Sequence, residues 1–266
     1  MSATPIVRKA PVAVGILENI PPESPSQVRE RAPTKLLAAK AASLLASAPM
    51  LAIPSFAAIL LLPKGLDGAR IVDLVISLAF GSAVPVLGAV AFPAKVSRLF
   101  DFKEERTRPL LFGAVGYFVG TGILVTVSAP VFAILLMFCY GTNTLAVLFI
   151  NHYWKISIHS MGVAGPTTAL IYTFGLAGAL FGLVLLPVAW SRLYLKKHTG
   201  GQILAGASLG YLMTTVQFWV IGTRLFNTVT NFAFDALLAT ALMLPPVVLV
   251  VWYRSSDLTR SMGAGT

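Results

Sequence analysis

Three histidines, His152, His159 and His198, are the residues best suited to chemistry, because each lies in a polar segment between long apolar runs. An imidazole can act as a nucleophile or transfer a proton near neutral pH. Two of them have companions that suit a phosphate group, since Ser157 lies two residues before His159 and Arg192 lies six before His198. Hydroxyl and guanidinium groups bind phosphoryl oxygens, so the pattern predicts phosphate chemistry.

Local sequence places these residues at helix ends. We expect Ser157 and His159 to begin a helix, where unpaired N–H groups and the helix dipole favour an anion. A third segment, Lys103 to Pro109, ends a basic loop where another apolar run begins. After His198, we expect Gly200 and Gly201 to let the chain turn tightly between two helices.

The elements that carry these segments must be membrane helices. Of the 266 residues, 56% are hydrophobic and 11% are charged, whereas soluble domains are about 45–50% apolar and about 25% charged. This composition excludes a water-soluble enzyme, a disordered protein and a repeat solenoid. The single cysteine, Cys139, excludes an internal disulfide framework and a multi-cysteine metal site. In a multispan chain, the net charge of +10 indicates membrane orientation and anionic lipid rather than a nucleic-acid partner.

The apolar runs predict an all-α integral membrane bundle of about eight helices. Two uncharged runs are each too long for one span, so each must form two helices. The first breaks at Ser128-Ala129-Pro130, and the second forms a short hairpin that breaks near Gly175–Gly178. The predicted spans are residues 41–62, 71–93, 110–150 as two helices, 160–191 as the hairpin, 203–222 and 236–253.

The chain divides into three parts. Residues 1–35 form a disordered, proline-rich, basic tail, residues 36–255 a membrane helical domain, and residues 256–266 a C-terminal tail. The first tail lacks the early apolar stretch of about 7–15 residues that a signal peptide needs. Most Lys and Arg residues share one face with the three histidines. The positive-inside rule therefore predicts that both termini and the candidate site lie on the cytoplasmic side of a cell membrane.

The polar segments resemble, in order, the motifs of the type 2 phosphatidic acid phosphatase superfamily, which are membrane lipid phosphatases. Those motifs are Lys-x6-Arg-Pro, then Pro-Ser-Gly-His, then Ser-Arg-x5-His-x3-Asp. Ser191, Arg192 and His198 match the third motif with the same spacing. Ser157 and His159 match the second motif.

The sequence departs from the family pattern at several positions. Ile156 and Ile158 replace the proline and glycine of the second motif, and Lys103 lies two residues too close to Arg108-Pro109 in the first. The largest departure is Gln202, which stands where the family has aspartate.

The resemblance implies a six-helix phosphatase-like core over roughly residues 71–222 and a phosphohistidine mechanism without a cofactor. His198 would attack phosphorus, and His159 would protonate the leaving oxygen and later activate water. The phosphoryl oxygens would be held by Lys103, Arg108, Ser157 and Arg192. No group of potential ligands in the sequence has the spacing of a metal site.

Gln202 leaves three alternatives open. Its amide oxygen could accept the hydrogen bond that orients His198. A carboxylate of Asp101, Glu104 or Glu105 could take that place instead. The third alternative is a protein that binds lipid phosphate with little or no turnover.

The expected substrate is a lipid phosphate, since helix ends at the headgroup layer would admit a phosphate while its tail stays in the bilayer. A cytoplasmic site favours an isoprenoid or polyprenyl (di)phosphate, with phosphatidic acid or phosphatidylglycerol phosphate as alternatives. A non-catalytic lipid-phosphate-binding protein and a small-molecule transporter are the rival functions. Transport is disfavoured because Asp73 and Asp235 lie near the ends of spans rather than in mid-membrane.

Overall fold

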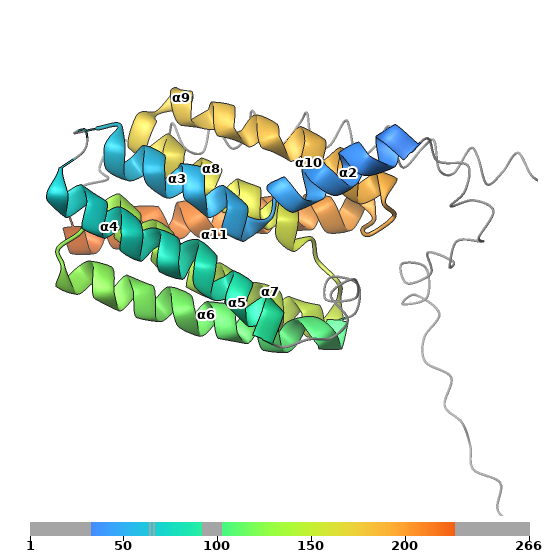
Figure 1. Ribbon diagram of the computed structural model, residues 1–266, viewed down its shortest axis with the longest axis horizontal. Coiled ribbons are helices and arrows are strands. Elements are labelled where there is room, and N and C mark those ends of the chain that lie inside the picture. Colours follow the sequence, from blue (N-terminus) through green and yellow to red (C-terminus); the bar gives the residue numbers. More distant parts are fainter. Residues whose placement is uncertain (1–32, 64, 66, 92–102, 227–266) are drawn as a thin grey trace, which may run out of the picture.

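The computed structural model describes residues 33–63, 65, 67–91 and 103–226, which form helices joined by short turns (Figure 1). Five of the described helical segments are long and apolar enough to cross a membrane, and a bent helix pair counts as a further span. The protein is therefore an all-α, multi-pass membrane bundle. The predicted span 236–253, the C-terminal tail and residues 1–32 of the N-terminal tail lie outside the described residues.

The first two described helices, α2 (Pro33–Leu45) and α3 (Ala48–Leu61), meet at a bend of 56°. The expectation of one helix over residues 41–62 is therefore wrong. The physical reason is local. Ser47, the residue before α3, has an extended backbone and makes no capping hydrogen bond with its side chain. Pro49 follows in the first turn, without the N–H that a continuous helix would use. The bend directs α3 against α8 and α2 against α10.

The next span is continuous but irregular. It consists of α4 (Gly68–Leu78), the π-helical turn η2 (Ala79–Ala83) and α5 (Val84–Ala91), which together confirm the predicted span 71–93 to within a few residues. Asp67 caps its start by accepting a hydrogen bond of 2.7 Å from the Arg70 N–H. A π turn widens the helix by one residue, and here it directly precedes α5, whose second residue is Pro85.

Helices α6 (Lys103–Thr126) and α7 (Val131–Tyr153) form the next two spans and pack side by side (Figure 1). The predicted break at Ser128-Ala129-Pro130 is confirmed. Ser128 takes a left-handed conformation, with φ of 57°. The N–H groups of Ser128 and Ala129 donate to the Val125 and Leu124 carbonyls, a closure that commonly ends helices.

The predicted hairpin over residues 160–191 is confirmed, and it turns at Gly175, where φ is 62°. Its first arm is α8 (Ile158–Phe174). Its second arm is α9 (Leu176–Ala179), the short 3₁₀ segment η3 (Leu180–Val184) and α10 (Leu185–Tyr194). The last described helix is α11 (Gly200–Phe226).

Helix α8 lies at the centre of the bundle and is buried without interruption from His159 to Tyr172. Its neighbours are α3, α7, α10 and α11. Small residues allow the closest approach: a Cβ placed on Gly210 of α11 would lie 2.8 Å from the Cβ of Ala164 on α8. Close backbone contact of this kind is a common way for helices to pack in membranes.

Candidate functional site

The site begins at the turn between α10 and α11. The N–H groups of Lys196 and Lys197 donate to the Leu193 and Arg192 carbonyls, each at 3.0 Å, which closes the end of α10. Lys196 occupies the left-handed position of this turn, with φ of 51°, although glycine is the usual residue there. Lys197 and His198 follow, and Thr199 then leads into α11.

The expectation that Gly200 and Gly201 make this turn is wrong. Both glycines belong to the first turn of α11, and neither has a positive φ. The Lys196 conformation already reverses the chain, so the glycines are not needed for that purpose. A Cβ on Gly201 would meet nothing within 4 Å, which leaves the start of α11 open on that side.

Thr199 and Gln202 form a capping box at the start of α11. The Gln202 N–H donates to the Thr199 hydroxyl oxygen at 3.3 Å. In return, the Thr199 N–H donates to the Gln202 side-chain oxygen Oε1 at 3.1 Å. A Thr-x-x-Gln pair of this type satisfies two N–H groups that the helix itself leaves unpaired.

The same Gln202 oxygen lies 3.1 Å from Nδ1 of His198, and this contact identifies Nδ1 as a nitrogen that carries a hydrogen. The Thr199 N–H can only donate, so the Gln202 atom that it meets must be the oxygen. That oxygen can only accept, so Nδ1 of His198 must carry the hydrogen. The neutral imidazole then has its lone pair on Nε2, which is the form required for a nucleophile.

The start of α8 lies directly against this turn (Figure 1). The Ser157 N–H donates to the Gln202 backbone carbonyl at 3.1 Å, which confirms that the second and third motif segments share one face. A Cβ on Gly206 of α11 would lie 2.3 Å from the Ser157 carbonyl oxygen. Only glycine therefore allows α11 to approach Ser157 so closely.

Ser157 caps α8 and His159 is its second residue, as the sequence predicts. The Ser157 hydroxyl accepts a long hydrogen bond of 3.4 Å from the Ser160 N–H and lies 3.0 Å from the Ser160 hydroxyl. His159 is 7% exposed and His198 is 2% exposed. The structure thus joins two buried imidazoles, each on or beside a helix start, through one backbone hydrogen bond between their segments.

Arg192 is 3% exposed, so its head does not extend outward to lipid headgroups. Its guanidinium Nη1 donates to the Ser43 hydroxyl of α2 at 2.6 Å. The neighbouring Ser191 hydroxyl donates back to the Val188 carbonyl within α10. The structure therefore holds Arg192 between two helices, and α2 supplies one of its partners.

The residues of the first motif are placed differently. Arg108 lies in α6 and its side chain is exposed, unlike Arg192. Lys103 is the first residue of α6, but its side chain lies outside the described part of the structure, as do the side chains of Glu104 and Glu105. Asp101 also lies outside the described residues, so the alternative in which a carboxylate orients His198 stays a prediction.

Sequence reasoning missed three contributors to the site. The Thr199–Gln202 capping box is visible in the sequence as Thr-Gly-Gly-Gln before an apolar run. Nothing in the sequence connects Ser43 with Arg192, or Gly206 with Ser157, because these contacts depend on how the helices pack.

Among the residues that the structure describes, no three or more His, Cys, Asp or Glu side chains gather where they could hold a metal ion. Comparison of the chain with family models, with curated proteins and with solved structures finds no match. The fold and site together define a multi-pass membrane protein with buried imidazole, guanidinium, hydroxyl and amide groups on adjoining segments at the starts of α8 and α11 and the end of α10.

Proposed function

We propose that the protein is an integral membrane lipid phosphatase in which His198 becomes transiently phosphorylated. The observation that supports this most strongly is the chain of hydrogen bonds from the Thr199 N–H and from His198 Nδ1 to the single oxygen Gln202 Oε1. It orients the ring through Nδ1, and in the neutral imidazole Nε2 then carries the lone pair that a nucleophile needs. Buried ionisable residues in a membrane protein are costly, and they generally mark function.

In the first step, His198 Nε2 forms a bond to phosphorus while the bond from phosphorus to the lipid oxygen breaks. The electron pair of that bond stays with the lipid oxygen, and protonated His159 supplies a proton to it. In the second step, water attacks the phosphorus of the phosphohistidine and His159 takes up a water proton. The N–P bond breaks, inorganic phosphate is released, and both histidines return to their starting states.

Gln202 takes the orienting role of the family's aspartate without its negative charge. Its oxygen holds the Nδ1–H of His198 and stabilises, through its dipole, the positive charge that develops on the ring during attack. The capping box makes this oxygen rigid, because Thr199 holds the same side chain from the other side. Little reorganisation is then required when the charge forms.

The phosphoryl oxygens are held by fixed donors around His198. Arg192 contributes a buried guanidinium, and Ser157 contributes its hydroxyl. The N–H groups of Gly200 and Gly201 lie in the first turn of α11, where the helix itself supplies no acceptor, so they can donate to an anion at the helix start. Exposed Arg108 extends the positive charge toward the headgroup layer, and Lys103, at the start of the same helix, is assigned the same role in this proposal.

The test is phosphate release by the purified protein from a panel of lipid phosphates, which includes polyprenyl phosphate, polyprenyl diphosphate and phosphatidic acid. His198→Ala should abolish release and should also abolish acid-labile labelling of the protein from a ³²P-lipid. His152→Ala is the matched control, because His152 is exposed at the end of α7 and should leave both signals unchanged. Full release by His198→Ala would refute the mechanism.

A second function, binding of lipid phosphate without turnover, is favoured by the uncharged Gln202. It predicts that the wild-type protein binds the same lipids in an equilibrium assay while no phosphate is released from any of them. The phosphatase proposal predicts both binding and release.

A further inference from the structure

The proposed phosphate site is closed. The four side chains that would contact a phosphoryl group from α8, α10 and the start of α11 are all buried, at no more than 7% exposed: Ser157, His159, Arg192 and His198. A charged phosphate must nevertheless reach them from water or from the headgroup layer. Some part of the protein must therefore move to admit it, as lids do in many enzymes.

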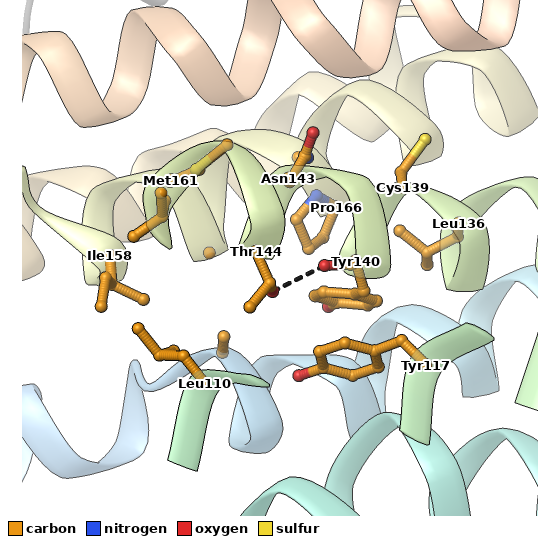
Figure 2. Close-up of a pocket in the computed structure, with 14 residues that line it drawn as sticks. Leu110, Tyr117, Leu136, Cys139, Tyr140, Asn143, Thr144, Ile158, Met161 and Pro166 are labelled. Carbon is orange, nitrogen blue, oxygen red and sulfur yellow. Dashed lines mark hydrogen bonds between the residues drawn. The ribbon is translucent and has the colours of Figure 1, made fainter. Parts of the chain in front are cut away.

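The cavity beside the start of α8 does not provide that entrance. It lies between α6, α7 and α8, and Figure 2 shows the apolar side chains of Leu110, Leu136, Ile158 and Met161 in its wall. None of the four site residues lines it. The entrance must then lie on another side of the site.

Helix α2 covers the site on the side of α10, although it carries none of the four residues. It lies beside α10 (Figure 1), and the hydroxyl of its half-buried Ser43 accepts a hydrogen bond of 2.6 Å from Nη1 of Arg192. If α2 moved away from α10, the Arg192 guanidinium would become exposed. Its Nη1 group could then donate to a phosphoryl oxygen in place of Ser43.

Apart from this hydrogen bond, α2 is held weakly. Among the α2 side chains that the structure describes, Ala39 alone is buried. Three leucines of the same helix are 66–70% exposed, namely Leu37, Leu44 and Leu45. The burial of a single methyl group stabilises α2 on α10 only slightly. Segments with so few buried apolar contacts are the ones that open most easily.

A hinge separates α2 from the rest of the bundle at Ser47. The Ser47 backbone is extended, its side chain makes no capping hydrogen bond, and Pro49 has no N–H with which to continue a helix. Beyond the hinge, α3 is fixed because it buries large side chains in the core, among them Leu51, Phe56 and Leu60. A rotation at Ser47 can therefore move α2 while α3 stays in place.

We propose that α2 is a gate, which turns about Ser47 away from α10 to admit a phosphate to Arg192, and that Ser43 is the latch that holds it closed. The inference rests on the proposed function, which assigns a phosphate to this site. In the closed form, the Ser43 oxygen occupies the place beside Nη1 that a phosphoryl oxygen takes in the open form. Ser43 and phosphate compete for one donor, so bound phosphate favours the open gate.

The experiment measures opening through the reactivity of a buried thiol. In Ala39→Cys protein, purified in detergent, the introduced thiol is covered in the closed form and reacts with N-ethylmaleimide only when α2 has moved. Cys139 is the internal control in every sample, because it is the one native cysteine and is 1% exposed on α7. Mass spectrometry follows both thiols. We expect the introduced thiol to be labelled while Cys139 stays unlabelled.

Ser43→Ala removes the latch, and Ser43→Thr is the matched variant that keeps a hydroxyl. In the Ala39→Cys background, Ser43→Ala should raise the labelling rate about 10–100-fold, the equivalent of one hydrogen bond to a charged group. Ser43→Thr should label near the parent rate. All three proteins contain the introduced sulfur, so its own effect on packing cancels. Ala52→Cys, at a buried position of α3 beyond the hinge, should stay unlabelled.

The gate is overturned if the introduced thiol reacts no faster than Cys139, or if Ser43→Ala and Ser43→Thr label at the same rate. Equal labelling of Ala52→Cys and Ala39→Cys would also overturn it, because the whole bundle would then be opening.

Inorganic phosphate, added to the same assay, tests the proposed function separately. It should speed labelling of Ala39→Cys protein, and this effect should be lost in Arg192→Gln. If Ser43→Ala opens the gate but phosphate leaves the rate unchanged, the gate stands and the phosphate site is refuted.

Discussion

The starts of α8 and α11 lie side by side and each holds one of the two proposed catalytic histidines, but they are stabilised in different ways. At α11, Thr199 and Gln202 pair through two reciprocal hydrogen bonds, and the same glutamine holds His198. At α8, the Ser157 cap bond is long, at 3.4 Å. The position of Ser157 depends instead on a backbone bond to Gln202 and on close contact with Gly206.

The difference separates two tasks. A nucleophile must have one tautomer and one orientation at all times, and a local capping box provides both. The proposed acid and base, His159, donates a proton in one step and accepts one in the next. It must lie beside the nucleophile, but it does not need a hydrogen-bond acceptor that fixes one protonation state. The start of α11 is therefore fixed by its own residues, and the start of α8 is positioned by α11.

After the complete loss expected for His198→Ala, the largest effect should follow from His159→Ala. We expect the rate of lipid phosphate hydrolysis to fall by about 10²–10⁴, the usual contribution of a positioned acid or base. With p-nitrophenyl phosphate, whose leaving group needs no proton, formation of the phosphoenzyme should be much less affected. Single-turnover kinetics with both substrates measure this, and equal losses would show that His159 acts in some other way.

A pair of substitutions at Gln202 tests the capping box against the orienting role. Gln202→Ala removes both and should lower the rate by roughly 10–100-fold, the equivalent of one hydrogen bond to a charged group. Gln202→Glu keeps the capping box and adds a negative charge, so its rate should equal or exceed that of the wild type. A Glu variant slower than the Ala variant would show that Asp101, Glu104 or Glu105 already provides the carboxylate.

Gly206→Ala tests the claim that α11 positions α8. The added Cβ would lie 2.3 Å from the Ser157 carbonyl oxygen, so the helices must separate, at a cost of about 1–3 kcal/mol in the free energy of unfolding. Gly122→Ala is the control, because a Cβ there would meet nothing within 4 Å. Denaturation in detergent should show a loss of stability at Gly206 only, and a fully stable Gly206→Ala would contradict the packing argument.

The smallest effects distinguish the two caps directly. Thr199→Ala should cost about 0.5–2 kcal/mol of stability, the usual value for a helix N-cap. Ser157→Ala should cost less, because its cap bond is long. Thr199→Ser retains the hydroxyl and should recover most of the loss. Denaturation of the three variants measures their losses of stability. A larger loss for Ser157→Ala than for Thr199→Ala would contradict the conclusion that the cap of α11 is the stronger one.

Features set by local residues could be predicted from the sequence. Proline and glycine signals located the breaks at Ser128–Pro130 and Gly175, and Ser157 was correctly placed at a helix start. The bend at Ser47 was missed because the apolar run continues through it and Pro49 is its main local signal. The left-handed backbone conformation of Lys196, at a position where glycine is usual, could not be predicted from the sequence because lysine rarely adopts it.

Features set by packing could not be predicted. Ser43 and Arg192 lie 149 positions apart in the chain, and their contact requires the bend that brings α2 onto α10. The close approach of Gly206 to Ser157 likewise depends on how α11 packs against α8. The sequence therefore identified residues that fit phosphate chemistry, but it could not show what holds them in place.

The burial of α8 from His159 to Tyr172 has a consequence for how the protein enters the bilayer. A helix whose middle contacts only protein needs little hydrophobicity in its final state, and α8 accordingly carries serine, threonine and histidine side chains along its 17 residues. During synthesis, however, each span must first partition from the translocon into lipid, where such polar residues are unfavourable. We therefore expect α8 to insert poorly into the bilayer on its own and to stay inserted only when α7 and α10 pack against it. The helix that carries His159 would then be among the last to take its stable transmembrane position.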